Sequence, residues 1–130
     1  NLFVVHVGDS RAYLIKDNKI KQITTDHSVV QEMIDSGEIT HEEALSHPNK
    51  NLITRALGVM PDIKMDFIEA DFSQGNKLLL ATDGLTNYLS DNEIISFMTS
   101  FDDSEVCDKM VEYAKSAGGG DNITVALIVA

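Results

Sequence analysis

The sequence predicts an α+β fold with a mostly antiparallel sheet, and two observations support this class. Short apolar runs typical of strands occur in sets at the start, in the middle and at the end of the chain. Helical patterns are gathered between these sets instead of alternating with every strand, as a parallel β-α-β fold would require. The 130 residues, of which 43% are hydrophobic, are enough for one domain with a real core.

The start of the chain has the pattern of three consecutive strands. Residues 2–7 and 11–16 are strand-like runs on either side of a turn-forming tripeptide at 8–10, which is typical of a hairpin. A second turn at 17–18 leads into a third run at 19–24. We therefore expect an antiparallel meander in which each strand pairs with the next.

Residues 26–58 change to a helical pattern and are expected to form a compact segment of short helices. Ser28 and Gln31 have the spacing of a capping box, in which two side chains satisfy free backbone N–H groups at the helix start. Gly37 provides a helix stop, because glycine adopts the left-handed backbone that closes many helices. A second box at 40–43 predicts another short helix.

The second half of the chain predicts two strands, two helices and a final strand. Residues 63–68 alternate between the two faces of a half-buried strand, and 77–81 is a short run that is nearly all apolar. A capping box starts a helix over about 90–99, and an aspartate is expected to cap a longer helix over about 102–117. Residues 122–130 are apolar at both alternating positions, which predicts a central strand covered on both faces.

The composition limits the partners and the compartment that can be expected. The formal net charge of −11 argues against nucleic acid or an anionic membrane surface as a partner, and it favours cations. No unbroken apolar run approaches the roughly 18 residues of a membrane span. Cys107, the one cysteine, falls on a helical apolar stripe, so we expect a core residue in a reducing, cytoplasmic setting. Because a strand-like run begins at Leu2 without a lead-in, the chain is expected to start inside a longer protein.

Three aspartates are the candidate functional residues: Asp9 in Val-Gly-Asp-Ser-Arg, Asp83 in Ala-Thr-Asp-Gly-Leu and Asp121 in Gly-Gly-Gly-Asp-Asn. Each adjoins a strand-like run, so each carboxylate is expected at a strand end, where several oxygens can converge on one point. Hard divalent cations such as Mg²⁺, Mn²⁺ and Ca²⁺ need oxygen ligands of this kind. Taken singly, each aspartate also has a purely structural interpretation as a turn or strand-end residue.

Six short strings follow one another along the chain with short connections between them. The strings are Val-Gly-Asp-Ser-Arg-Ala-Tyr-Leu, Thr-Thr-Asp-His-Ser, Ile-Thr-His-Glu-Glu-Ala with a later His-Pro, Leu-Ile-Thr-Arg-Ala-Leu-Gly, Leu-Leu-Ala-Thr-Asp-Gly-Leu and Gly-Gly-Asp-Asn-Ile-Thr-Val. In this order they resemble the metal-dependent Ser/Thr protein phosphatases of type 2C, and they cover nearly the whole chain. The segment 26–58 resembles the mobile flap of the bacterial branch of that family.

The resemblance implies a four-layer sandwich, in which two antiparallel sheets pack face to face with helices outside and two metals between the sheets. Residues 1–130 resemble only the C-terminal part of this single catalytic domain. Missing are an arginine that clamps the substrate phosphate and an Asp-Gly-x-x-Gly-Gly-His loop whose aspartate bridges both metals. A partial α-β-β-α sandwich that is inactive by itself is therefore expected.

The resemblance also implies roles for the aspartates. Asp83 and Asp121 resemble ligands of the first metal, and Asp9 resembles the ligand that joins Asp83 at a third, weaker site. Asn122 resembles a neighbour that forms hydrogen bonds to the ligands. The implied cofactors are Mn²⁺ or Mg²⁺, two of them catalytic, which lower the pKa of a shared water that attacks phosphorus. No side-chain nucleophile is then needed, and none is evident in the sequence.

Other residues invite a functional interpretation, but a structural one is favoured for most of them. Arg11, beside a serine, is a candidate for phosphate binding and is expected instead to pair with carboxylates. The Asp-His-Ser tripeptide at 26–28 is similar to half of a hydrolase relay and is better explained as a helix cap. Arg55 in the flap-like segment is a candidate for shaping substrate access. The acidic stretch at 102–108 complements the dipole of its own helix.

Two functions are consistent with these patterns. The resemblance favours hydrolysis of phosphoserine and phosphothreonine in proteins, with phosphorylated proteins as substrates and a Ser/Thr kinase as the opposing enzyme. The alternative is a non-catalytic, phosphatase-like binding or regulatory module, and the presence of all three aspartates speaks against it. In either case, uncovered sheet edges and an apolar inner face are expected to make the isolated chain self-associate.

Overall fold

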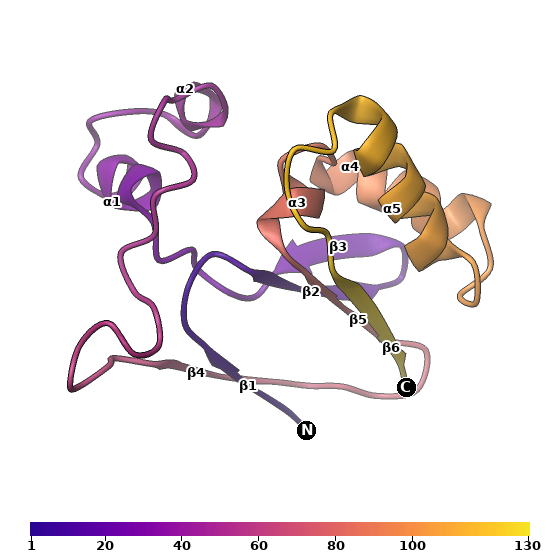
Figure 1. The fold of residues 1–130 in the computed structure, drawn as a ribbon. Coiled ribbons are helices and arrows are strands. Elements are labelled where there is room, and N and C mark those ends of the chain that lie inside the picture. Colours follow the sequence, from indigo (N-terminus) through magenta and orange to yellow (C-terminus); the bar gives the residue numbers. More distant parts are fainter.

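The computed structural model describes residues 1–130 and contains six strands and five helices (Figure 1). The elements are β1 (Leu2–His6), β2 (Arg11–Lys16), β3 (Lys19–Gln22), α1 (Val29–Asp35), α2 (His41–Leu45), β4 (Asp66–Ala70), β5 (Lys77–Ala81), α3 (Asp83–Thr86), α4 (Asp91–Ser100), α5 (Val106–Ala117) and β6 (Val125–Val129). A two-stranded sheet has the order β1-β4 and a four-stranded sheet the order β3-β2-β5-β6. Every pairing is antiparallel, which confirms the α+β class with antiparallel sheets.

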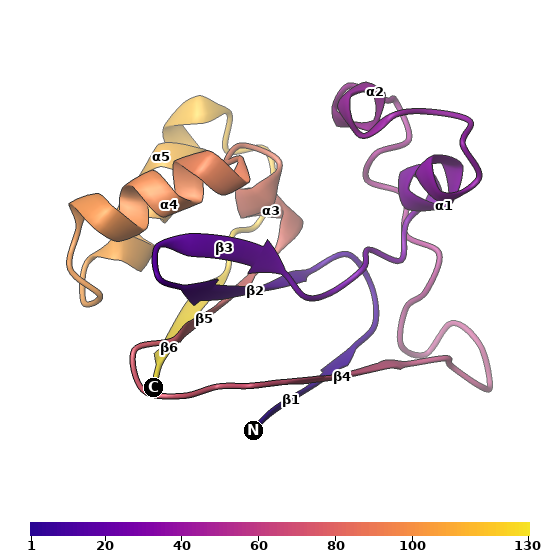
Figure 2. The same cartoon turned by 180° about the vertical axis from the view of Figure 1, so that it is seen from behind.

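The layers can be followed in two opposite views of the ribbon. Helices α3, α4 and α5 cover one face of the four-stranded sheet, and the two-stranded sheet lies on the side away from these helices (Figures 1 and 2). Helices α1 and α2 stand apart from both sheets and are joined to them by loops. The chain therefore forms one helical layer and two sheet layers, as expected for part of a four-layer sandwich.

The main core lies between the four-stranded sheet and its helices. Tyr13 of β2 and Leu79 of β5 stand opposite each other in the sheet, and both are fully buried. Cys107 packs against this core from a partly buried position, which agrees with its expected structural role. The apolar stripe of α5 supplies three further fully buried side chains, Val106, Met110 and Ala114.

The predicted hairpin between the first two strands is wrong. β1 pairs with β4, with Val4 opposite Ile68, whereas both edges of β2 are occupied by β3 and β5. A strand has only two hydrogen-bonding edges, so β1 has no place beside β2, and residues 8–10 carry the chain from one sheet to the other. The turn between β2 and β3 is confirmed, because Asp17 and Asn18 have the positive φ values of 51° and 58° that a tight hairpin turn requires.

The last strand also differs from its prediction. β6 pairs only with β5 and forms an edge of its sheet, so it is not a covered central strand. Helix α5 packs against β6, but Ile128 and Val129 remain 44% and 49% exposed. The apolar pattern on both faces therefore belongs to a strand for which this chain supplies a cover on one side only. Strand β6 also begins at Val125 and β4 at Asp66, each three residues later than predicted.

Most helices begin and end at the predicted residues. The Ser28 hydroxyl accepts a hydrogen bond from the Gln31 N–H at the start of α1. In the boxes at 40–43 and 90–93, both reciprocal cap hydrogen bonds are formed. Gly37 follows α1 with a φ of +79°, as the predicted stop requires.

Helix α5 begins later than an aspartate cap would place it. The Asp102 carbonyl accepts hydrogen bonds from the N–H groups of both Glu105 and Val106, so a separate turn precedes the helix. Glu105 is the N-cap residue, and its side chain makes no capping hydrogen bond. None of the helices combines the length and the apolar content that crossing a membrane demands.

Candidate functional site

The three candidate aspartates lie at one end of the four-stranded sheet. Asp9 belongs to the connection between β1 and β2, Asp83 is the first residue of α3 directly after β5, and Asp121 precedes β6. Because β5 runs antiparallel to both of its neighbours, its last residue stands beside the first residues of β2 and β6. Strand-end placement, which the sequence predicts, is therefore confirmed for all three.

Backbone contacts hold the loop of Asp121 against the start of α3. The Thr82 N–H donates to the Thr124 carbonyl at 3.0 Å, and the Thr124 N–H donates to the Thr82 hydroxyl at 3.0 Å. A Cβ atom on Gly84 would lie 2.1 Å from the Asn122 carbonyl oxygen, so only glycine allows this approach. The Asp-Gly pair thus joins a carboxylate to the one residue type that lets the Asp121 loop come close.

The carboxylates influence one another electrostatically. Burial, the negative charges of Asp9 and Asp121, and a hydrogen bond with Asp121 together raise the pKa of Asp83 above its ordinary value of 3.8. The pKa of Asp9 is also raised, first by burial and then by the charge of Asp26, with a smaller effect of Asp121. Asp121 Oδ1 accepts a hydrogen bond from the backbone N–H of the next residue, Asn122, at 2.7 Å.

The three carboxylates offer the oxygen donors that a hard divalent cation takes, but their ligand atoms are not all within 4.8 Å of one another. The mutual repulsion of the carboxylates is the kind of strain that a bound cation relieves. Asp9 and Asp83 also line a polar cleft of about 550 Å³, and its opposite wall comes from α1, α2 and the loop after them, with Gln31, His41 and Lys50. The other wall includes residues of α3 and the start of α4, and Figure 1 shows α1 and α2 standing apart from these helices.

The sequence patterns did not predict helix α3. It has four residues, too few for a helical period to show, and the side chain of its N-cap residue Thr82 forms no capping hydrogen bond. Its effect on the site is nevertheless direct, because Asp83 is its first residue and Gly84 and Leu85 are buried within it. A strand that ends in Thr-Asp-Gly-Leu is the only local signal.

Arg11 pairs with a carboxylate, as expected. Its guanidinium forms a bidentate contact with Asp26, through Nε at 3.0 Å and Nη2 at 2.7 Å, and Nη1 donates to the Tyr13 hydroxyl at 3.3 Å. Burial opposes the positive charge of Arg11, but the hydrogen bonds with Asp26 prevail, so its pKa is raised. Arg11 lines the cleft with its charge already matched.

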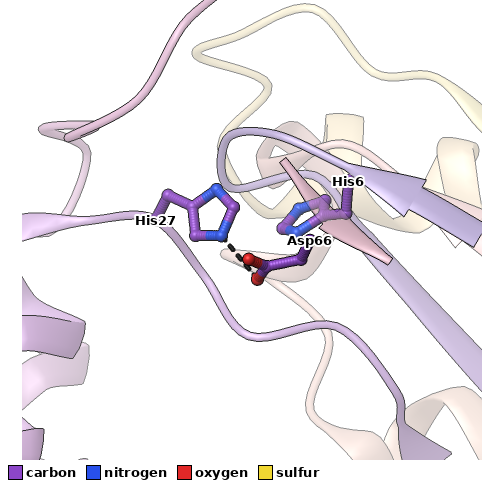
Figure 3. Close-up of side chains that lie close together, drawn as sticks. All are labelled: His6, His27 and Asp66. Carbon is purple, nitrogen blue, oxygen red and sulfur yellow. Dashed lines mark hydrogen bonds and ion pairs between the residues drawn. The ribbon is translucent and has the colours of Figure 1, made fainter. Parts of the chain in front are cut away.

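A second cluster, formed by His6, His27 and Asp66, was not predicted from the sequence (Figure 3). His6 and His27 are buried, and each of the three side chains offers a ligand-type atom within 4.8 Å of the others. It is the one group of three such side chains gathered so tightly. The three residues are far apart in the sequence and form no metal-ligand motif there. The pairing of β1 with β4 places His6 opposite Asp66, and the start of the flap-like segment adds His27.

The hydrogen bonds of this cluster describe a network without a metal. His27 Nδ1 accepts from the Gly8 N–H at 3.0 Å, so its neutral ring carries the proton on Nε2, which faces Asp66 Oδ2 at 2.7 Å. His6 Nε2 lies 2.8 Å from the Ser10 carbonyl, which only accepts, so Nε2 carries the proton there too. A metal would have to displace the His27 proton from Nε2, whereas His6 is held through Nε2 alone and its buried Nδ1 has no hydrogen-bond partner.

Arg55 has a structural partner rather than a place in the cleft. Its Nη1 donates to Asp66 Oδ1 at 3.1 Å and to the Lys64 carbonyl at 3.2 Å. Asp66 therefore holds His27 with one oxygen and Arg55 with the other. The expected role of Arg55 in substrate access finds no contact that supports it.

The layered fold, with aspartates at one end of the larger sheet, places the chain among α+β proteins built on two antiparallel sheets. A family model described as protein phosphatase 2C matches residues 1–33 and 54–123, which is most of the chain. The chain belongs to the protein phosphatase 2C family. Two stretches are unmatched: residues 34–53 lie inside the flap-like segment, and 124–130 include β6.

Similar proteins with curated descriptions are bacterial phosphatases. Protein phosphatase PhpP of Streptococcus pneumoniae is 46% identical over 126 residues, which is 95% of this chain and 50% of the relative. Serine/threonine phosphatase stp of Listeria welshimeri is 43% identical over 126 residues, 96% of this chain and 50% of the relative. The chain therefore spans about half the length of these relatives.

Solved structures of phosphatases also match nearly all of this chain and about half of their own length. The serine/threonine phosphatase PstP/Ppp of Mycobacterium tuberculosis superposes with a TM-score of 0.91 and 38% identity, over 96% of this chain and 53% of that one. A structure of the PstP catalytic domain described as a complex with two manganese ions has a TM-score of 0.79 and 34% identity, over 96% and 51% of the two chains.

Proposed function

We propose that this chain is the C-terminal part of the catalytic domain of a metal-dependent protein Ser/Thr phosphatase, with 26–58 as its flap. The observation that carries the proposal is the placement of Asp9, Asp83 and Asp121 at one end of the sheet of a member of this family, where the charges of Asp9 and Asp121 act on Asp83. Substrates are phosphoserine and phosphothreonine in proteins, and a Ser/Thr kinase supplies them. The names of the relatives support this substrate class.

The aspartates are proposed as metal ligands, Asp83 and Asp121 toward the first ion and Asp9 with Asp83 toward a third, weaker one. Mn²⁺ is favoured over Mg²⁺ by the two manganese ions described for PstP. When bound, such ions supply an acidified water for attack on phosphorus. The chain's own residues hold the ions and shape the cleft: Gly84 admits the Asp121 loop, and Arg11 is kept from competing for the carboxylates by its pairing with Asp26.

Full activity is not expected of the chain by itself. The family resemblance places an aspartate that bridges both ions in an Asp-Gly-x-x-Gly-Gly-His loop, and residues 1–130 do not contain this loop. The chain also spans half the length of its relatives. A cytoplasmic setting is proposed in addition, on the strength of one partly buried free cysteine and no disulfide.

The test compares the chain with the full-length protein on a phosphothreonine peptide in the presence of Mn²⁺. We expect hydrolysis by the full-length protein, its loss in Asp83→Asn, and little hydrolysis by the chain. Full-length protein that binds Mn²⁺ yet leaves the peptide intact would support the alternative, a phosphatase-like binding module. Equal activity of the chain and the full-length protein would refute the claim that further ligands are required.

A further inference from the structure

Both backbone polar groups of Gly8, the residue before Asp9, are hydrogen-bonded to one buried histidine, His27. The Gly8 N–H donates to His27 Nδ1 at 3.0 Å, and the His27 N–H donates to the Gly8 carbonyl at 2.8 Å. The His27 side chain is 4% exposed, so water does not compete for this contact. Gly8 has a φ of +110°, a conformation that other residues rarely adopt, and Asp9 follows it directly.

The far side of the His27 ring is fixed by Asp66. Nε2 of His27 faces Asp66 Oδ2 at 2.7 Å (Figure 3). Arg55 Nη1 donates to the other carboxylate oxygen, Oδ1, at 3.1 Å. A carboxylate that accepts this bond keeps the proton on Nε2 and leaves Nδ1 as an acceptor. One tautomer therefore satisfies both Asp66 and Gly8, which lie on opposite sides of the ring.

A second histidine holds the residue after Asp9. His6 Nε2 donates to the Ser10 carbonyl at 2.8 Å, and its ring lies 4.7 Å from the His27 ring. Gly8 and Ser10, the two neighbours of Asp9, are thus each bound by a buried imidazole. The connection between the sheets is held here by side chains, where no strand pairing is available to hold it.

We propose that His27 is a positioning residue for Asp9: its Nδ1 fixes the Gly8 backbone, and Asp66 sets the tautomer that makes this possible. The link to metal binding rests on the proposed function, because it requires Asp9 to be a ligand. His27 is also the second residue of the flap-like segment, and its carbonyl accepts a hydrogen bond from the Thr54 N–H, near the other end of that segment, at 2.8 Å. The base of the flap and the Asp9 turn consequently share one residue.

Two matched amide variants separate this role from a general loss of packing. In His27→Asn, an amide oxygen can take the place of Nδ1 and accept from Gly8, whereas in His27→Gln the amide reaches the place of Nε2 and faces Asp66. Both remove the ring and both keep the backbone hydrogen bond to Gly8. Thermal unfolding of each variant checks that it folds.

The readouts are hydrogen exchange of the Gly8 amide by NMR and titration of the chain with Mn²⁺ alone. We expect His27→Asn to resemble the wild-type chain in both. In His27→Gln, Gly8 exchange is expected to accelerate and Mn²⁺ affinity to fall, each by about tenfold, the equivalent of one good hydrogen bond.

Equal Gly8 exchange in the two variants would overturn the inference. It would also be overturned if Zn²⁺ bound the wild-type chain, released the Gly8 amide and lost its site in Asp66→Asn, because the cluster would then be a metal site. A wild-type chain that binds no Mn²⁺ but protects Gly8 in the expected order would contradict the proposed role of Asp9 and Asp83 as metal ligands and leave the positioning of the backbone by His27 supported.

Discussion

The carbonyl oxygen of Asn122 lies 2.1 Å from the point where a Cβ atom on Gly84 would stand. Because a real Cβ atom never tolerates such a distance, Gly84→Ala must push the Asp121 loop away from α3. We expect a loss of about 1–3 kcal/mol in the free energy of unfolding, the usual range for overpacking, together with weaker Mn²⁺ binding. Denaturant unfolding and Mn²⁺ titration measure the two effects.

Gly120→Ala is the matched control for that substitution. A Cβ at Gly120 would meet only the Tyr88 hydroxyl at 3.6 Å, an ordinary contact, so its cost should stay within about 0.5 kcal/mol. If both variants lost the same stability, the close approach at Gly84 would not be what joins the Asp121 loop to α3.

Replacing Asp83 by Asn should stabilise the metal-free chain. Asp83 is partly buried beside Asp9 and Asp121, so its charge is repelled in the folded state, as its raised pKa shows. Removing the charge at pH 7 should increase the midpoint of thermal unfolding by a few degrees, and added Mn²⁺ should then no longer increase it.

Asp71→Asn, at an exposed position, is the control for losing one negative charge from a chain of net charge −11. It should leave the stabilisation by Mn²⁺ intact. A lower midpoint of thermal unfolding for Asp83→Asn without Mn²⁺ would show that this carboxylate stabilises the fold. It would argue against a role of Asp83 in cation binding.

His6 should make stability depend on pH in a defined window. Burial lowers its pKa below 6.5, although the hydrogen bond to the Ser10 carbonyl partly opposes this. The unfolded chain therefore binds more protons than the folded chain just below pH 6.5, and the contribution of His6 is present above that pH and is lost as the pH falls toward the folded pKa.

His6→Gln tests this dependence, because its amide can still donate to the Ser10 carbonyl but cannot titrate. The free energy of unfolding, measured from pH 7 down to pH 5, should fall less steeply than in the wild-type chain. His41→Gln, at an exposed site, controls for the loss of an imidazole. A wild-type slope in His6→Gln would mean that the acid sensitivity arises elsewhere.

The two-stranded sheet should mediate self-association of the isolated chain. Val5 and Phe67 stand opposite each other and are 58% and 74% exposed, and Phe3 on the same face is 71% exposed. Phe67→Lys should reduce the mass measured by light scattering, because it places a charge in the middle of this patch. Leu57→Lys removes an equally exposed apolar group from the flap and should not. A monomeric wild-type chain at micromolar concentration would contradict the prediction.

Local chemistry explains what the sequence predicted well. Caps such as Ser28, Thr40 and Ser90 act within one helical turn, and the Asp17–Asn18 turn acts within four residues, so short patterns determine them. The placement of the three aspartates at strand ends was predictable for the same reason. Asp83 follows β5, whereas Asp9 and Asp121 precede β2 and β6. Because β5 is antiparallel to both of these strands, the three aspartates lie at the same end of the sheet.

Long-range pairing explains what the sequence did not predict. The choice of β4 over β2 as the partner of β1 depends on which edges the rest of the chain occupies, and no local signal at residues 8–10 records it. The cluster of His6, His27 and Asp66 follows from that pairing, since His6 and Asp66 are opposite residues of β1 and β4. The sequence also did not predict that β6 is an edge strand. Apolar residues at both alternating positions show that both faces of a strand can be buried, but they do not show whether this chain supplies the elements that bury them.

Calorimetric titration of the chain with Mn²⁺, in the wild type and in Asp83→Asn, shows whether a cation binds at the end of the sheet. We expect weak but saturable binding in the wild type, its loss in Asp83→Asn and its weakening in Asp9→Asn. Binding that survives Asp83→Asn and disappears in Asp66→Asn would place the cation at the histidine cluster and would refute the assignment of Asp83 as a metal ligand.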